Sequence, residues 1–160
     1  MHARHRLRFA GAALAFMPVL TVAACSTGGS AEEPVTATAP GGITLTVERA
    51  EGLAEGDEID VSATGLDPES GYYLGLCRAE MTPGKPCAEC AGRQDGSTQK
   101  WFRNNGAPEG ISADGTISST LTVSTSGRSV DCTSDACVIK LFGDHVEGFG
   151  DIVEIPVEVE

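Results

Sequence analysis

The sequence has few basic residues, few aromatic residues and no long apolar run, and each shortage excludes a class of function. Only 11 of its 160 residues are lysine or arginine, against 23 aspartates and glutamates. With so few cations the chain cannot neutralise a run of phosphates, so we expect no nucleic-acid partner. The longest apolar run, Phe9–Ala24, contains Pro18 and is shorter than the roughly 20 residues that span a bilayer. We therefore expect no membrane-spanning helix.

Motifs of catalysis are missing as well. The chain contains no Gly-x-Ser-x-Gly elbow, no P-loop and no His-Glu-x-x-His. After residue 24 one histidine remains, His145, which directly follows Asp144. A carboxylate beside a histidine can orient a general base, but a glycine-flanked turn is the simpler setting for this pair. The acidic run Glu55–Glu58 lacks the spacing of a calcium loop. We expect a protein that is not an enzyme, with no metal and no cofactor.

The N-terminus carries an export signal. Met1–Arg8 holds three arginines and no acidic residue, and the apolar run Phe9–Ala24 ends in Val-Ala-Ala directly before Cys25. This order predicts a secretory signal peptide over residues 1–24. A cysteine directly after the small residues is similar to a bacterial lipobox, in which the thiol is diacylated and becomes the new N-terminus. We predict lipidation of Cys25 and a position at the outer face of the cell membrane. The alternative is plain signal cleavage that leaves Cys25 as an ordinary thiol.

Without residues 1–24 the chain keeps eight basic residues against 23 acidic ones, a formal charge of −15. This charge disfavours flat contact with an anionic membrane, so the lipid would have to supply the anchoring. A negative field favours cationic or neutral ligands. The simpler explanation is that the acidity keeps an exported protein soluble.

The rest of the chain divides into a tether and one all-β domain. Residues 25–42 are small, polar and rich in glycine and proline, which predicts a flexible tether. Residues 43–160 show short alternating runs separated by turn residues, and no convincing helical period. They predict a seven-stranded, immunoglobulin-like antiparallel β-sandwich. Pro156 suggests an edge position or a bulge in the last strand, and Ala79–Gly96 is expected to be a loop held by a disulfide. The expected strands are Ile43–Val47, Ile59–Ala63, Tyr72–Cys77, Gln99–Arg103, Ile117–Val123, Cys137–Phe142 and Ile152–Val159.

Five cysteines follow Cys25, and in an exported protein disulfides are the expected state. Cys132 and Cys137 bracket a small loop of four residues. Cys77 ends an expected strand, and either Cys87 or Cys90 can return to it. Two structural disulfides and one odd thiol are the preferred interpretation. The alternatives are a redox pair in Cys87-Ala-Glu-Cys90, which lacks a βαβ context, and a zinc site shared with Cys132 and Cys137, which oxidation disfavours.

Two stretches resemble a known family. Gly52-Leu-Ala-Glu-Gly56, Ile59-x-Val61, Gly65-Leu66 and Tyr72-x-Leu-Gly75-x-Cys77 are similar to the N-terminal half of neocarzinostatin-family apoproteins, and Val130–Cys137 is similar to their second cysteine loop. The resemblance implies a seven-stranded immunoglobulin-like sandwich with disulfides Cys77–Cys87 and Cys132–Cys137, which leaves Cys90 unpaired. It also implies an apolar cleft, in which the best-known members shield a reactive enediyne chromophore. Together with the lipobox-like segment, the resemblance implies a domain carried by a bacterial lipoprotein of actinobacterial type.

The positions that match the family's cleft are Tyr73, Gly75, Ala79, Lys85, Val138, Lys140 and Phe142. Lys85 and Lys140 would place ammonium groups in or over this cleft, and Ala79 lacks the bulk of a stacking aromatic ring. These departures argue against an enediyne carrier. Trp101 and Phe102 are adjacent in an expected strand, so their side chains point to opposite faces and one of them faces outward.

We therefore expect a cell-surface lipoprotein that binds a small apolar or aromatic ligand, or a surface partner. The expected ligand-binding residues are Tyr73, Gly75, Trp101, Val138, Lys140 and Phe142. The alternative is a structural or adhesive envelope module without a ligand pocket, and enediyne sequestration is a third, less favoured hypothesis. A ligand binder should change the fluorescence of Trp101 on adding an aromatic compound, whereas an envelope module should not.

Overall fold

The computed structural model describes residues 33–160, so the predicted signal peptide and the predicted lipidation site, Cys25, lie outside the described residues. The described part is built of strands, and within it no helix is long and apolar enough to cross a membrane. The strands are β1 (Val35–Thr38), β2 (Thr44–Val47), β3 (Glu58–Thr64), β4 (Tyr72–Arg78), β5 (Gln99–Phe102), β6 (Ile117–Thr122), β7 (Cys137–Gly143) and β8 (Asp151–Val157). The all-β prediction is confirmed, with one strand more than the seven expected.

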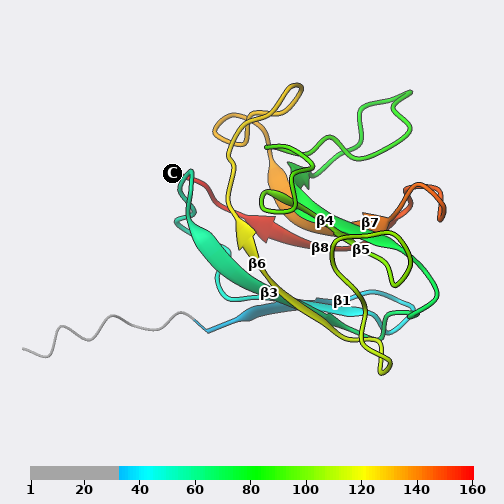
Figure 1. Ribbon diagram of the computed structural model, residues 1–160. Helices are drawn as coiled ribbons and strands as arrows, with labels where there is room; N and C mark the ends of the chain where they lie inside the picture. Colours follow the sequence, from blue (N-terminus) through cyan, green and yellow to red (C-terminus); the bar gives the residue numbers. More distant parts are fainter. Residues whose placement is uncertain (1–32) are drawn as a thin grey trace, which may run out of the picture. The chain divides into compact units, whose positions relative to one another are not determined.

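The strands form two antiparallel sheets that face each other across the core (Figure 1). One sheet has the order β1-β2-β3-β6 and the other has the order β5-β4-β7-β8. Alternation sets the inner faces: in β3, Ile59, Val61 and Ala63 are buried while Glu58 and Asp60 are exposed. β8 lies at the edge of its sheet, so Pro156 stands where its missing N–H disturbs the ladder least, as expected.

The predicted tether is too long, because its last part belongs to the fold. Val35–Thr38 forms β1 and pairs with β2, with Val35 opposite Val47 and Thr38 opposite Thr44. The Thr38 and Thr44 hydroxyls lie 2.9 Å apart. Valine and threonine favour strands, but on this exposed edge strand they have no apolar alternation to distinguish them from a polar linker. The folded domain therefore begins before Ile43.

One predicted disulfide is wrong: Cys77 is bonded to Cys90, not to Cys87, and Cys87 is the free thiol. Backbone hydrogen bonds explain the choice. The Arg78 N–H donates to the Glu89 carbonyl at 2.8 Å and the Ala91 N–H donates to the Leu76 carbonyl at 2.8 Å, which sets Cys90 directly opposite Cys77. Cys87 precedes this ladder by three residues.

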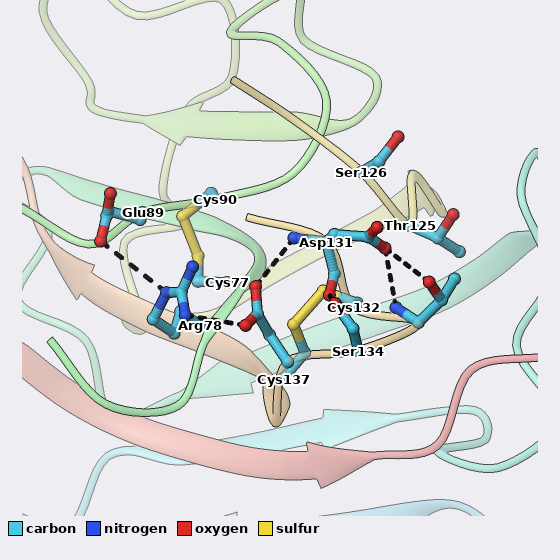
Figure 2. Close-up of a disulfide and its surroundings, with 12 residues drawn as sticks. Cys77, Arg78, Glu89, Cys90, Thr125, Ser126, Asp131, Cys132, Ser134 and Cys137 are labelled. Carbon is cyan, nitrogen blue, oxygen red and sulfur yellow. Dashed lines mark hydrogen bonds and ion pairs between the residues drawn. A yellow bond between two sulfur atoms is a disulfide. The ribbon is translucent and has the colours of Figure 1, made fainter. Parts of the chain in front are cut away.

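The second disulfide joins Cys132 to Cys137, the pairing that the family resemblance implies. It lies near the first one, and Arg78 connects their surroundings by donating to the Asp135 carboxylate at 2.9 Å (Figure 2). Because Cys90, Cys132 and Cys137 are all in disulfides, they cannot form the zinc site considered from the sequence. Within residues 33–160 no group of three or more His, Cys, Asp or Glu side chains is arranged to hold a metal ion.

Candidate functional site

A cluster of aromatic rings covers one end of the outer face of the second sheet. Tyr73 in β4 pairs with Trp101 in β5 and with Phe142 in β7. Its ring centroid lies 6.1 Å from that of Trp101 and 5.6 Å from that of Phe142. Phe102 points the opposite way and is 1% exposed in the core, so Trp101 is the outward residue of the adjacent pair.

The loop after β7 folds back over these rings. The His145 ring lies 5.4 Å from Trp101, and its Nδ1 lies 3.0 Å from the Tyr73 hydroxyl oxygen. Phe149 stacks on Tyr73 with 6.3 Å between ring centroids. Phe149 also has a φ of 59°, which is uncommon for a bulky residue and indicates that the packing holds this loop in place.

Asp144 fixes the loop and Trp101 to each other. This fully buried carboxylate accepts hydrogen bonds from the Trp101 Nε1–H at 3.1 Å and from Arg103 at 2.6 Å. Its other oxygen accepts the backbone N–H groups of Val146 and Glu147. Burial by itself would raise the pKa of Asp144, but these hydrogen bonds outweigh it and lower the pKa to about 2. The site therefore keeps a buried negative charge at neutral pH.

Between Trp101, Tyr73 and His145 lies a cavity of about 310 Å³, which we call the aromatic pocket. This volume is at the lower end of the range for small-molecule sites. Burial, followed by the charge of Asp144, raises the pKa of Tyr73, so its phenol stays neutral. The remaining wall residues are Gln94, Asp95, Gly96, Gln99, Lys100 and Pro108.

The charged residues of the aromatic pocket have defined partners. Hydrogen bonds from the Ser97 and Thr98 backbone N–H groups hold the pKa of Asp95 well below its usual range, so this wall residue is ionised. Lys100 is held 3.2 Å from a Glu109 carboxylate oxygen. Asp95 is therefore the one wall charge of the pocket that no ion pair compensates among the described residues.

Of the predicted ligand residues, Tyr73 and Trp101 line the pocket. Gly75, Val138, Lys140 and Phe142 share their face of the sheet but are buried, so they do not line it. Lys140 is 0% exposed, and its Nζ lies 2.8 Å from carboxylate oxygens of both Asp151 and Glu154 on β8. Burial would lower the pKa of Lys140, but these hydrogen bonds raise it. The ammonium group is thus neutralised inside the protein.

The other two positions matched to the cleft lie away from the aromatic pocket. The Ala79 N–H donates to the Ala136 carbonyl at 2.9 Å. The Lys85 side chain is half-exposed and lies 3.7 Å from a Glu89 carboxylate oxygen. Sequence reasoning missed the role of Asp144, which it treated only as a neighbour of His145. Its signal was weak: an aspartate that follows a strand and a glycine, as in many turns.

Comparisons with known proteins agree with this fold. A model of the neocarzinostatin family matches residues 45–158. "Thiamine biosynthesis protein X" of Corynebacterium glutamicum is 43% identical over 108 residues, which cover 66% of this chain. The match spans 57% of the length of that protein. Among solved structures, macromomycin matches with a TM-score of 0.50 and 23% identity, over 74% of this chain and 99% of its own. At this identity the likeness to macromomycin supports the fold alone.

Proposed function

The chain belongs to the neocarzinostatin family, and from this premise we propose that it is a non-enzymatic protein that binds a small planar aromatic ligand in the aromatic pocket. The observation that carries the proposal is the cavity of about 310 Å³ between the rings of Trp101, Tyr73 and His145. Aromatic rings attract flat aromatic ligands by offset stacking. Asp144 and the Tyr73–His145 contact already hold the rings in place, so these side chains lose little conformational entropy when a ligand binds.

The size of the pocket favours a ligand of one or two rings. On the neighbouring part of the sheet Lys140 and Phe142 are buried, and Gln99 and Cys90 occupy the space that a side chain at Gly75 would enter. A large chromophore would have no open floor there. We therefore do not propose enediyne sequestration for this chain.

The charges around the pocket favour a neutral or cationic ligand. Asp95 is ionised, and the Trp101 and Tyr73 faces attract cations through their ring quadrupoles. The relative from Corynebacterium glutamicum is named for thiamine biosynthesis. Thiamine contains an aminopyrimidine and a cationic thiazolium ring, both planar heterocycles, so thiamine and its two ring precursors are the first ligands to test.

The neighbourhood of His145 gives no support to catalysis. Its Nδ1 contacts the Tyr73 hydroxyl, and no carboxylate of residues 33–160 is bonded to its ring. The oxygens of Asp144 are occupied by Trp101, Arg103 and two backbone N–H groups instead. A histidine base of this kind is oriented by a carboxylate, and among the described residues the ring nitrogens of His145 contact only the Tyr73 hydroxyl.

We also propose that the protein is exported and held at the outer face of the cell membrane by lipid on Cys25. The sequence pattern of residues 1–25 supports this location. Nine residues, Ser26–Pro34, separate Cys25 from β1. Nine residues reach about 30 Å at most, so the domain would stay close to the membrane surface. Mass spectrometry of the mature protein tests the proposal, because a diacylated Cys25 must be its first residue.

Fluorescence titration tests ligand binding directly, because Trp101 is the single tryptophan of the chain. We expect saturable quenching or a spectral shift with thiamine or one of its heterocycles at micromolar concentration. H145A removes one wall of the pocket and should weaken binding about tenfold. V146A is the matched control, because Val146 is the next residue, is 62% exposed and lies outside the pocket. No response to any planar heterocycle would contradict the proposal and favour an envelope module without a ligand.

A further inference from the structure

A second cavity lies between two loops that the proposed function does not use. It has a volume of about 550 Å³ and is lined by Gly92, Arg93, Ser124, Ser126, Gly127 and Arg128. We call it the arginine pocket. Two of its six lining residues are arginines, in a chain with 11 basic residues against 23 acidic ones. Such a local concentration of positive charge needs an explanation.

The arginine pocket is lined by the basic side chains that form no ion pair within the described residues. Residues 33–160 contain eight lysines and arginines. Six of them are in salt bridges: Arg49, Arg78, Lys85, Lys100, Arg103 and Lys140. The two others among these residues are Arg93 and Arg128, and both line this cavity. Both arginines are therefore available to an anion that enters the cavity.

The fold brings the two loops together closely. The Gly92 N–H donates to the Ser126 carbonyl at 2.9 Å. A Cβ at Gly127 would lie 2.9 Å from the Cys90 carbonyl oxygen, so this position has room only for glycine. The Cys77–Cys90 disulfide holds the first loop on β4. The backbone between the arginines is therefore held in place, while both arginine side chains are exposed.

Carboxylates close to the arginine pocket in the fold or in the sequence, Glu55, Glu89 and Asp95, have other partners, and Glu89 pairs with Arg78. Glu55 accepts the Thr125 N–H at 2.6 Å and the Ser124 hydroxyl at 3.2 Å. Asp95, two residues after Arg93, accepts N–H and hydroxyl groups from Ser97 and Thr98. In Figure 2 the Ser126 hydroxyl points away from the two disulfides, and no interaction is drawn to it. Ser126 lines the arginine pocket together with the two arginines, so its hydroxyl is a further donor for a ligand there.

We propose that the arginine pocket binds the phosphate group of a small phosphorylated molecule. A guanidinium group can donate two parallel N–H···O hydrogen bonds to phosphate oxygens. The Ser126 hydroxyl can donate one more. The volume exceeds the needs of a phosphate group alone and matches a small organic phosphate. This inference is independent of the aromatic pocket and of its ligand.

Isothermal titration of the mature protein tests the inference with inorganic phosphate and phenyl phosphate at constant ionic strength, with chloride as the reference. We expect 1:1 binding, and we expect R93Q and R128Q each to weaken it about tenfold. K85Q is the matched control, because it removes one surface charge outside the pocket and should leave binding unchanged. Within residues 33–160 neither arginine side chain has an ion-pair partner, so R93Q and R128Q should melt at the wild-type temperature.

Three results would overturn the inference. One is the absence of binding by both phosphates at millimolar concentration. Another is equal weakening by K85Q and R93Q, because this would show a general charge effect without a site. The third is binding only to vesicles that contain phosphatidylglycerol, because the arginines would then recognise lipid headgroups at the membrane surface.

Chemical-shift changes at the Gly92 and Gly127 amides would place the bound phosphate in the arginine pocket.

Discussion

Replacing Asp144 should destabilise the protein and release Trp101 at the same time. D144A removes a fully buried carboxylate that accepts hydrogen bonds from Trp101, Arg103 and two backbone N–H groups. Breaking a buried ion pair costs about 3–5 kcal/mol. Arg103 is 18% exposed and keeps a contact to Glu147 at 3.8 Å, so the lower end applies, about 3 kcal/mol. For a domain of this size that corresponds to a fall in Tm of roughly 10 °C.

Thermal and urea unfolding measure this loss, and Trp101 emission in the folded variant reports the release of the ring. D144N keeps an oxygen for the backbone N–H groups but turns an NH₂ group toward two donors, so it should lose about 2 kcal/mol. D60A is the control, because Asp60 is exposed and, in the described part of the chain, its carboxylate accepts only from the Thr120 hydroxyl; its effect should stay within about 0.5 kcal/mol. Equal stability of D144A and D60A would refute the reasoning.

Three further predictions follow from the same contacts. The pKa of Asp144 is about 2 in the folded protein against an ordinary 3.8. Its ionisation therefore adds about 2 kcal/mol to the free energy of unfolding above pH 4, and this contribution is lost as the pH falls toward 2. Urea unfolding of D144N should lack this part of the pH dependence. Peptide mapping should yield Cys77 joined to Cys90, and C90S should lose about 3 kcal/mol while C87S changes stability little; a Cys77–Cys87 peptide would contradict the assignment. G71A places a methyl group against the Asp144 carboxylate and should lower Tm, whereas G41A meets no atom within 4 Å and should not.

Much of the fold could be predicted from the sequence because alternation is a local signal. The seven expected strands all occur, and the opposite directions of Trp101 and Phe102 follow from their adjacency in β5. β1 was missed because an exposed edge strand has no buried side to create a pattern. The extent of a folded domain is therefore least predictable at such an edge.

The errors at the site have a different cause, because they depend on partners that are distant in sequence. From their distance along the chain, Cys87 and Cys90 could both reach Cys77. Only the backbone hydrogen bonds of Leu76 and Arg78 place Cys90 opposite Cys77. Lys140 was expected to project into the cleft, but its side chain is buried and its ammonium group pairs with the β8 carboxylates. The arginine pocket could not be predicted either, because the sequence does not show that Arg93 and Arg128 lack ion-pair partners in the folded domain.

The proposed function requires that the aromatic pocket holds a ligand against Trp101. Because Trp101 is the single tryptophan, a ¹⁵N spectrum of the folded domain contains one indole N–H signal, from the group that donates to Asp144. Titration with thiamine and its two heterocycles should move this signal to saturation with 1:1 stoichiometry, and H145A should need about tenfold more ligand for the same movement. An indole signal that stays fixed throughout, up to millimolar concentrations of all three compounds, would contradict the central claim.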